Sequence, residues 1–312
     1  MTDLLTHGQL TQLTQTLEAG PDELAGLARL GADDLRVLRE RLSGLLFDAD
    51  EPVFARLSKL SPLVPTALLV KIAVSAIPPE VAGRAGGSLG IAQPDRVAEV
   101  LSALPATYLA DAAPHLDPRT VAALAPRLSG GMLIPTAVEL LRRQDYITAG
   151  RFIEFATDAL VDDLEQGISD DVGLLRTVAT TADSARLDEV VRRLPAARQE
   201  TIVRAAATGT DETLLAALSV LARVGEDLRA RLATVLVDAL DQRELDRLVT
   251  VAARRHALAE LFTALAATDT AIRSRVAEVI AAASTELSTA LTDAASTDAL
   301  RGELDELRAL RS

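Results

Sequence analysis

Apolar residues recur at helical spacing through almost the whole 312-residue chain, and this periodicity constrains the fold more than any motif. In segment 33–46 one apolar stripe is formed by Leu35, Leu38, Leu42 and Leu45. Mostly off that stripe lie Arg36, Arg39, Glu40 and Arg41. Pro, Gly and Asp separate segments of this kind, as Pro94, Pro118 and Pro135 do at expected helix starts. The pattern predicts about twenty short helices.

The composition favours the same fold class. Aromatic residues make up only 2% of the chain, although hydrophobic residues make up 49%. The apolar surface therefore comes from Leu, Val, Ala and Ile, of which Leu and Ala are strong helix formers, while the strand-favouring aromatic residues are scarce. We expect an all-α protein.

Two internal similarities indicate that the helices form repeats. Segment 96–106 aligns without a gap on segment 186–196, with six of the eleven positions identical and a shared Leu-Pro-Ala break. The sequence Val64-Pro-Thr-Ala67 is echoed by Ile134-Pro-Thr-Ala137, and each is expected to open an apolar helix. Stacked helical hairpins bury their apolar faces on their neighbours, which predicts an α-solenoid, an armadillo- or HEAT-like superhelix. The alternative is that helices rich in Ala and Leu look alike by composition alone.

The segment from Asp95 to Pro105, followed by Leu109 and by the segment from Leu116 to Leu124, resembles the cytoplasmic N-terminal helical domain of MgtE-type magnesium transporters. It is also similar to the armadillo-like domain of flagellar motor switch proteins. The resemblance covers residues 93–128 and, more faintly, 186–221, and it implies an α-solenoid. Neither transmembrane helices nor a nucleotide-binding module follows, so magnesium gating is not carried over to any residue here.

No linker rich in Ser, Gly or Pro divides the chain, so we expect a single elongated helical-repeat domain over residues 1–312. Weak sub-boundaries are expected near 83–93 and 208–211. The glycine-rich segment Gly83–Gly90 lacks the preceding strand and the lysine of a phosphate-binding loop, and is interpreted as a hinge or a helix C-cap.

Charge and hydropathy limit the partners. The net charge of −13 disfavours nucleic acid and anionic membrane surfaces. Residues 1–17 lack the basic start and apolar middle of a secretory signal. The most apolar run, Thr66–Ile77, is far shorter than the roughly 20 residues that span a bilayer, and it is interpreted as a buried core helix. A cytoplasmic protein without an integral membrane segment is expected, and the absence of cysteine is compatible with this.

No catalytic constellation is recognisable, so an enzyme is not expected and no cofactor is predicted. The three histidines, His7, His115 and His256, lie far apart and form no metal-ligand spacing. Between Phe152 and Leu175 seven carboxylates occur without a basic residue: Glu154, Asp158, Asp162, Asp163, Glu165, Asp170 and Asp171. A solvated acidic face or a docking patch for a basic partner is favoured there over a divalent cation site, because no calcium-loop spacing is present.

Aromatic and basic residues gather near the middle of the chain. The group consists of Arg142, Arg143, Tyr146, Arg151, Phe152 and Phe155. Phe152 and Phe155 are one helical turn apart, so they are expected to share a face. One interpretation is a binding pocket that takes a small apolar ligand with an anionic end. The other is ordinary core packing, which is the commoner fate of large apolar side chains.

These features favour a non-enzymatic scaffold or adaptor that binds a protein or peptide on the concave face of a superhelix. The alternative is a carrier or sensor that encloses a hydrophobic small molecule or lipid between its helices. It is motivated by the apolar run Thr66–Ile77 and the central aromatic group. An enzyme with an acid/base pair is the least favoured possibility, because carboxylates alone do not define a reaction.

Overall fold

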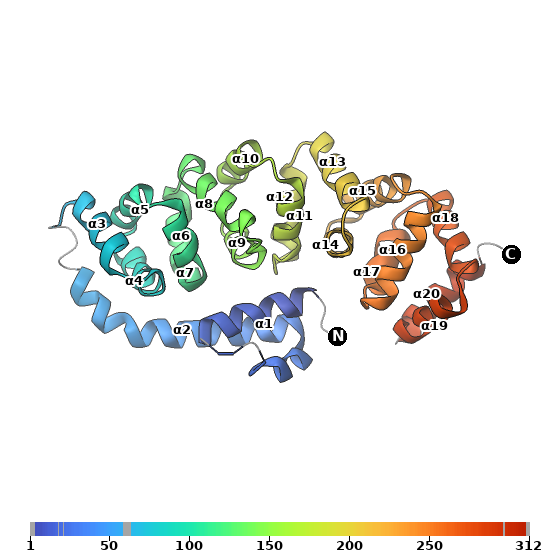
Figure 1. Ribbon diagram of the computed structural model, residues 1–312, viewed down its shortest axis with the longest axis horizontal. Helices are drawn as coiled ribbons and strands as arrows, with labels where there is room; N and C mark the ends of the chain where they lie inside the picture. The colour runs from blue at the N-terminus through green and yellow to red at the C-terminus, as the bar shows by residue number, and fades with distance from the viewer. Residues whose placement is uncertain (1–3, 18, 21, 59–63, 296, 310–312) are drawn as a thin grey trace. The chain divides into compact units, whose positions relative to one another are not determined.

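The computed structural model describes residues 4–17, 19–20, 22–58, 64–295 and 297–309. Within these residues the chain forms twenty α-helices and a few short 3-10 helices, and no β-strand occurs among them (Figure 1). The all-α prediction is therefore confirmed. The chain separates into two compact units, which are described in turn.

The N-terminal unit comprises Leu5–Asp170 and Thr180–Ala182. Its helices are, in chain order, α1 (Leu4–Leu17), η1 (Ala25–Leu30), α2 (Gly31–Ser58), α3 (Thr66–Ala76), α4 (Pro79–Ala92), α5 (Pro94–Ala103), α6 (Ala106–Ala112), η3 (Ala113–His115), α7 (Pro118–Leu124), η4 (Ala125–Arg127), α8 (Gly130–Arg142), α9 (Tyr146–Ile153) and α10 (Asp158–Gly167).

The C-terminal unit consists mainly of Asp171–Ala179 and Asp183–Ser312. Its helices are α11 (Asp171–Ala179), α12 (Ser184–Arg193), α13 (Ala196–Ala207), α14 (Asp211–Arg223), α15 (Glu226–Asp238), α16 (Gln242–Arg254), α17 (Leu258–Ala266), α18 (Thr270–Ala281), α19 (Thr285–Ala294) and α20 (Asp298–Ala309).

Within each unit a helix packs mainly on the helix two or three places further along the chain, as α6 does on α8 and α13 on α15. Ion pairs repeat at the same interval. Arg127 pairs with Asp95, 32 residues earlier, and Arg192 pairs with Asp227, 35 residues later. Arg275 donates to Asp238, 37 residues earlier, over 3.0 Å. Each of these three ion pairs joins segments that are 32 to 37 residues apart in the chain.

The two segments that match in sequence also match in local structure. In both, the helix ends before an extended leucine, Leu104 or Leu194, and the next helix is capped by a proline, Pro105 or Pro195. Arg96 and Arg186 each form an ion pair with the glutamate three positions on, at 2.6 and 2.7 Å. The shared Leu-Pro-Ala break thus encodes the same turn between two helices in both units.

The apolar core is distributed unevenly. Of the twelve largest fully buried side chains in the described part of the chain, ten belong to the C-terminal unit, for example Leu218 and Leu248. The other two, Leu13 and Leu35, belong to α1 and α2 of the N-terminal unit. In the N-terminal unit the most completely buried leucines are therefore supplied by its first two α-helices.

The interpretation of Thr66–Ile77 as a buried core helix is wrong. The segment does form a helix, α3, but none of its residues is buried. Leu68, Ile72 and Val74 are between 41% and 48% exposed. Helix α3 packs on α5 and leaves the rest of its apolar surface open. An apolar helix is buried only where other helices cover it, and hydropathy does not show whether they do. None of the described helices combines the length and the apolar character that crossing a membrane requires.

The segment Gly83–Gly90 is neither a hinge nor a C-cap, because α4 runs through it without a break. A Cβ atom at Gly83 would lie 2.6 Å from the carbonyl oxygen of Ala112, and one at Gly90 would collide with Thr120. The glycines therefore permit close approach of α4 to the segments around α6 and α7. The two units divide near Asp171–Asp183.

The expected helix start at Pro135 is also wrong. Helix α8 begins at Gly130, after the N-cap Ser129, and Pro135 lies inside it. A Cβ atom at Gly130 would overlap Asp163, whose carboxylate accepts a hydrogen bond from the Gly130 N–H over 3.1 Å. This anchored glycine starts the helix one turn earlier than the proline signal indicates. In contrast, Val64-Pro-Thr-Ala67 does open a helix, with Pro65 as the N-cap of α3.

Candidate functional site

The six residues of the predicted central site bind different groups and do not share one role. Arg142 and Arg143 lie at the C-terminal end of α8, where both bind Glu139. Arg143 also donates to Asp111, and the side chain of Arg142 is 68% exposed. Hydrogen bonds from Arg142 and Arg143 lower the pKa of Glu139 to about 2. These two arginines tie helix ends together at the surface.

Arg151 has a different role, because it is engaged by the backbone. Its guanidinium donates to the carbonyl oxygens of Pro114 and Leu116, each over 2.9 Å. Desolvation, followed by repulsion from Arg39, lowers its pKa to about 10. Arg151 therefore joins α9 to the turn before α7, and its donors are directed at protein carbonyls.

The aromatic residues of the group are half-buried. Tyr146 opens α9, and its carbonyl oxygen accepts a hydrogen bond from the Thr180 hydroxyl over 3.0 Å. Phe152 lies in the last turn of α9, whereas Phe155 lies beyond the helix, with its N–H bonded to the carbonyl oxygen of Phe152. The two rings are thus joined by a turn rather than by one continuous helical face.

The carboxylates of the acidic stretch also have separate partners. Asp163 accepts the Gly130 N–H, Asp171 pairs with Arg198 over 3.0 Å, and Glu154 accepts the Ala182 N–H over 3.0 Å. Among the described residues, no group of three or more His, Cys, Asp or Glu side chains is placed to hold a metal ion. The stretch does not act as one ligand cluster.

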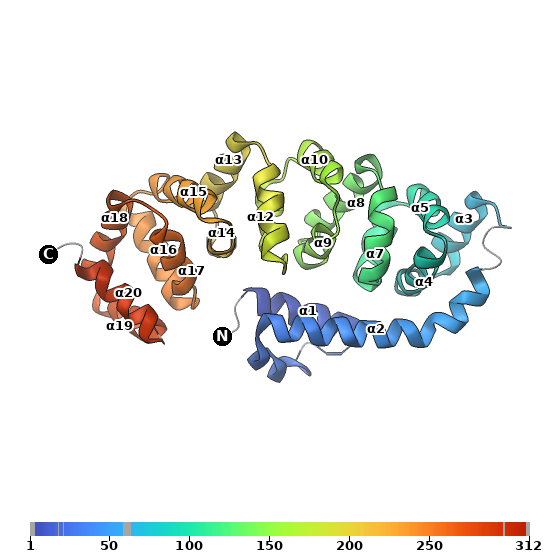
Figure 2. The ribbon, with the colours of Figure 1, turned by 180° about the vertical axis from the view of Figure 1, so that it is seen from behind.

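The feature that sequence analysis missed is how the first two α-helices dock. We call α1, η1 and α2 the N-terminal hairpin, and the side formed by α4, α7 and α9 the covered face. Figures 1 and 2 show α1 and α2 running along this side of the N-terminal unit. Helix α2 packs on α4, and the Gln12 side-chain amide donates to the carbonyl oxygen of Ile147 in α9. The hairpin therefore occupies a face that later helices build.

The hairpin buries polar side chains. In α1 the buried polar residues are Thr6, Gln9 and Gln12, and in α2 they are Arg39 and Ser43. They recur at helical spacing, so each helix has one buried polar stripe. The buried side of α2 also contains Leu35, one turn before Arg39. In contrast, Leu45, which was expected on the buried apolar side, is 67% exposed. The expectation that Arg39 lies off the buried side is wrong.

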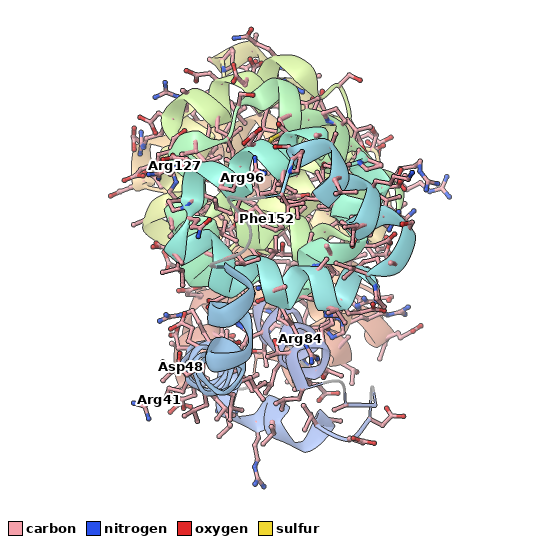
Figure 3. All side chains as sticks on the ribbon, turned by 90° about the vertical axis from the view of Figure 1, so that its left-hand side faces the viewer. Arg41, Asp48, Arg84, Arg96, Arg127 and Phe152 are labelled. Atoms are coloured by element: carbon pink, nitrogen blue, oxygen red, sulfur yellow. The ribbon has the colours of Figure 1, made fainter. Side chains whose placement is uncertain are left out.

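Arg39 is the charged centre of this contact. The residue is only 3% exposed, and its Nε donates to the Gln9 side-chain oxygen over 3.0 Å. Burial lowers its pKa, and attraction by Glu154 at the end of α9 opposes that change. By contrast, Arg41 on the same helix is exposed and extends outward (Figure 3). Within the hairpin, Arg39 is thus the guanidinium that faces the covered face.

Glu154 is the matching group on the covered face. Burial raises its pKa above the usual 4.5, while the Ala182 N–H and the charge of Arg39 act in the opposite direction. A second carboxylate, Asp117, is buried beside Arg151 and attracts its charge. The covered face therefore carries partly desolvated charges of both signs, and Arg39 of the hairpin attracts Glu154 and repels Arg151.

A pH-dependent contribution of Glu154 is expected. A carboxyl group whose pKa is raised by folding holds its proton more tightly in the folded chain, so its contribution to stability falls as pH rises above 4.5. Glu154→Gln removes this titration and keeps an oxygen that can accept the Ala182 N–H. Between pH 4.5 and 7, stability of the wild type should fall relative to Glu154→Gln. Chemical denaturation at a series of pH values measures this difference, and parallel curves would contradict it.

The exposed apolar surface is concentrated near the N-terminus. Among the residues whose burial the structure describes, ten of the eleven exposed large aliphatic residues lie between Leu17 and Ile91, the exception being Val138. They belong to the N-terminal hairpin, α3 and α4. Scattered exposed aliphatic residues are normal, but a concentration in one part of a chain is typical of a region that meets other molecules.

Comparison with protein-family models, curated proteins and solved structures finds no match for this chain.

Proposed function

We propose that this protein is a non-enzymatic adaptor of the α-solenoid type, and that it binds a helical segment of a partner protein on the covered face. The proposed solenoid would place α4, α7 and α9 on its concave side. The observation that carries the proposal is the N-terminal hairpin, which already lies on this face as helical polypeptide. The hairpin would act as an internal occupant that a partner replaces.

The polar character of the contact between the N-terminal hairpin and the covered face supports replacement of the hairpin by a partner helix. Members of this contact include Gln9, Gln12 and Arg39, so the contact resembles a polar interface between separate molecules more than an apolar core. Among the described residues, the Gln12 Oε1, Gln15 Oε1 and Thr148 Oγ1 atoms are buried without a hydrogen-bond partner. Each such atom costs about 1–3 kcal/mol, so a partner that satisfied them would compete well with the hairpin.

A released hairpin could also bind the partner through its exposed aliphatic residues. Leu45 and Leu46 on α2 face solvent while Arg39 and Ser43 are buried. A partner helix could therefore take the covered face while a second surface of the same partner covers Leu45 and Leu46. The resemblance to MgtE-type and armadillo-like helical domains agrees with protein binding, since curved helical repeats commonly present such faces.

The alternative of a hydrophobic carrier has lost its main support. Helix α3, which was expected to line an apolar interior, has no buried residue. Arg151, the expected anchor for an anionic ligand, donates to the carbonyl oxygens of Pro114 and Leu116. No observation specifically favours an enclosed small molecule, so the adaptor is retained as the single proposal.

A matched pair of variants tests the adaptor. Arg39→Glu places a carboxylate opposite Glu154, and we expect hydrogen exchange in α1 and α2 to accelerate by roughly tenfold or more as the hairpin opens. Arg41→Glu makes the same charge change on the outward side and should leave exchange unchanged. In affinity capture from cell extract, Arg39→Glu should enrich a specific protein relative to Arg41→Glu. Identical captured sets, with the hairpin shown to be open, would contradict the proposal.

A further inference from the structure

The N-terminal hairpin also shows which chemistry the covered face accepts, and this inference rests on the proposed function. We infer that the covered face selects a helix that presents one cationic side chain to Glu154, flanked four residues away by a leucine on one side and a small polar residue on the other. Helix α2 meets this description with Leu35, Arg39 and Ser43. Glu154 is then a specificity-determining residue.

Charge balance on the covered face is the first argument. The charged groups around Arg151 are the carboxylates of Glu154, Asp117 and Asp145 together with Arg39 from the hairpin. Without Arg39, one guanidinium is left among three carboxylates. A cation at the position of Arg39 reduces this excess of negative charge in a partly desolvated site, whereas an apolar residue there would remove the attraction of Arg39 for Glu154 and leave that of Arg151.

Spacing is the second argument. Leu35, Arg39 and Ser43 are four residues apart, so they follow one another along a single face of α2, and all three are buried. Ser43 supplies a small polar side chain at the last of these positions. Helix α2 also carries Arg41, which is exposed, lies on a different side of the helix and cannot replace Arg39. The requirement is therefore for a cation at one position and not for a basic helix in general.

The test uses the full chain with Arg39→Glu, which opens the hairpin, and labelled synthetic peptides with the sequence of residues 31–46. The peptides are the wild-type sequence, Arg39→Leu, Arg39→Glu and Arg41→Glu. The last two have the same net charge, so they separate a positional effect from general attraction to an acidic protein. Fluorescence anisotropy at two salt concentrations measures the affinities.

We expect the wild-type and Arg41→Glu peptides to bind alike, and the Arg39→Leu and Arg39→Glu peptides to bind roughly tenfold or more weakly. Adding Glu154→Gln to the protein should reduce this difference, since the amide keeps the Ala182 contact but lacks the charge. Equal affinity of all four peptides would overturn the inference and leave helix binding intact. Failure of every peptide to bind an opened hairpin variant would overturn the proposed function as well.

Discussion

Replacing Arg151 by alanine is expected to destabilise the N-terminal unit by about 3–5 kcal/mol, the largest effect of any substitution considered for this chain. Arg151 donates two hydrogen bonds of 2.9 Å from a desolvated guanidinium to the carbonyl oxygens of Pro114 and Leu116. Alanine removes both donors and leaves the two acceptors at a turn between hairpins. Hydrogen bonds that involve a charged donor contribute about 1.5–3 kcal/mol each.

One effect acts against this loss. Arg39 repels Arg151, and that repulsion contributes to the lowered pKa of Arg151. Removing Arg151 relieves the repulsion, but it also removes a cation that Glu154, Asp117 and Asp145 attract. These electrostatic changes partly cancel. The loss of the two hydrogen bonds therefore decides that Arg151→Ala lowers the stability.

Denaturant titration, with hydrogen exchange read at α7 and α9, measures the Arg151→Ala effect. Arg142→Ala serves as the matched control, because Arg142 is exposed and its ion pair within the described residues is to Glu139, three residues before it in the same helix. Its unfolding midpoint should equal that of the wild type. Equal midpoints for Arg151→Ala and Arg142→Ala would show that Arg151 is not the structural tie described here.

The helices themselves were predictable because their signals are local. Helix α5 starts at Pro94 and ends before Leu104, and α12 ends in the same way before Leu194. Each of these boundaries depends on a proline or on an extended residue within one turn of the helix end. The local match of segments 96–106 and 186–196 was therefore visible without knowledge of any distant contact.

The docking of the N-terminal hairpin was not predictable in this way. In α2 the leucine stripe suggested a buried side containing Leu45, yet the buried side contains Arg39 and Ser43. The choice depends on Gln9 in α1 and on Glu154 at the C-cap of α9, which is more than a hundred residues away. Periodicity identifies a helix and its apolar side, but the partner that covers each side is set by tertiary contacts. A signal was present in the regular spacing of Thr6, Gln9 and Gln12.

The partners of the three arginines in the predicted central group were not predictable for a related reason. Composition placed Arg142, Arg143 and Arg151 together, but the partner of each is decided by the preceding hairpin or by its own helix. Arg143 reaches back to Asp111, and Arg151 reaches back to Pro114 and Leu116. Arginines that join one helical segment to another look the same in sequence as arginines that bind a ligand, because the guanidinium can donate to either kind of partner.

The second large effect concerns two glycines of α4. Replacing each of them by alanine should change the stability in opposite directions. Alanine is normally favoured over glycine inside a helix by about 0.5–1 kcal/mol. At Gly86 a new Cβ would meet only the Leu116 side chain at an ordinary 3.5 Å, so Gly86→Ala should stabilise the N-terminal unit by about that amount.

At Gly83 the same methyl group would lie 2.6 Å from the Ala112 carbonyl oxygen and 2.8 Å from the His115 Cβ atom. A carbonyl oxygen belongs to the backbone and cannot rotate away as a flexible side chain can, so α4 must shift from its neighbours. Overpacking of this kind costs about 1–3 kcal/mol and outweighs the gain in helix propensity. Gly83→Ala should therefore lower the unfolding midpoint and Gly86→Ala should raise it, in thermal denaturation of the full chain. If both variants were stabilised, α4 would be free to move as the hinge that its glycines first suggested, and the close packing of α4 against Ala112 and His115 would be wrong.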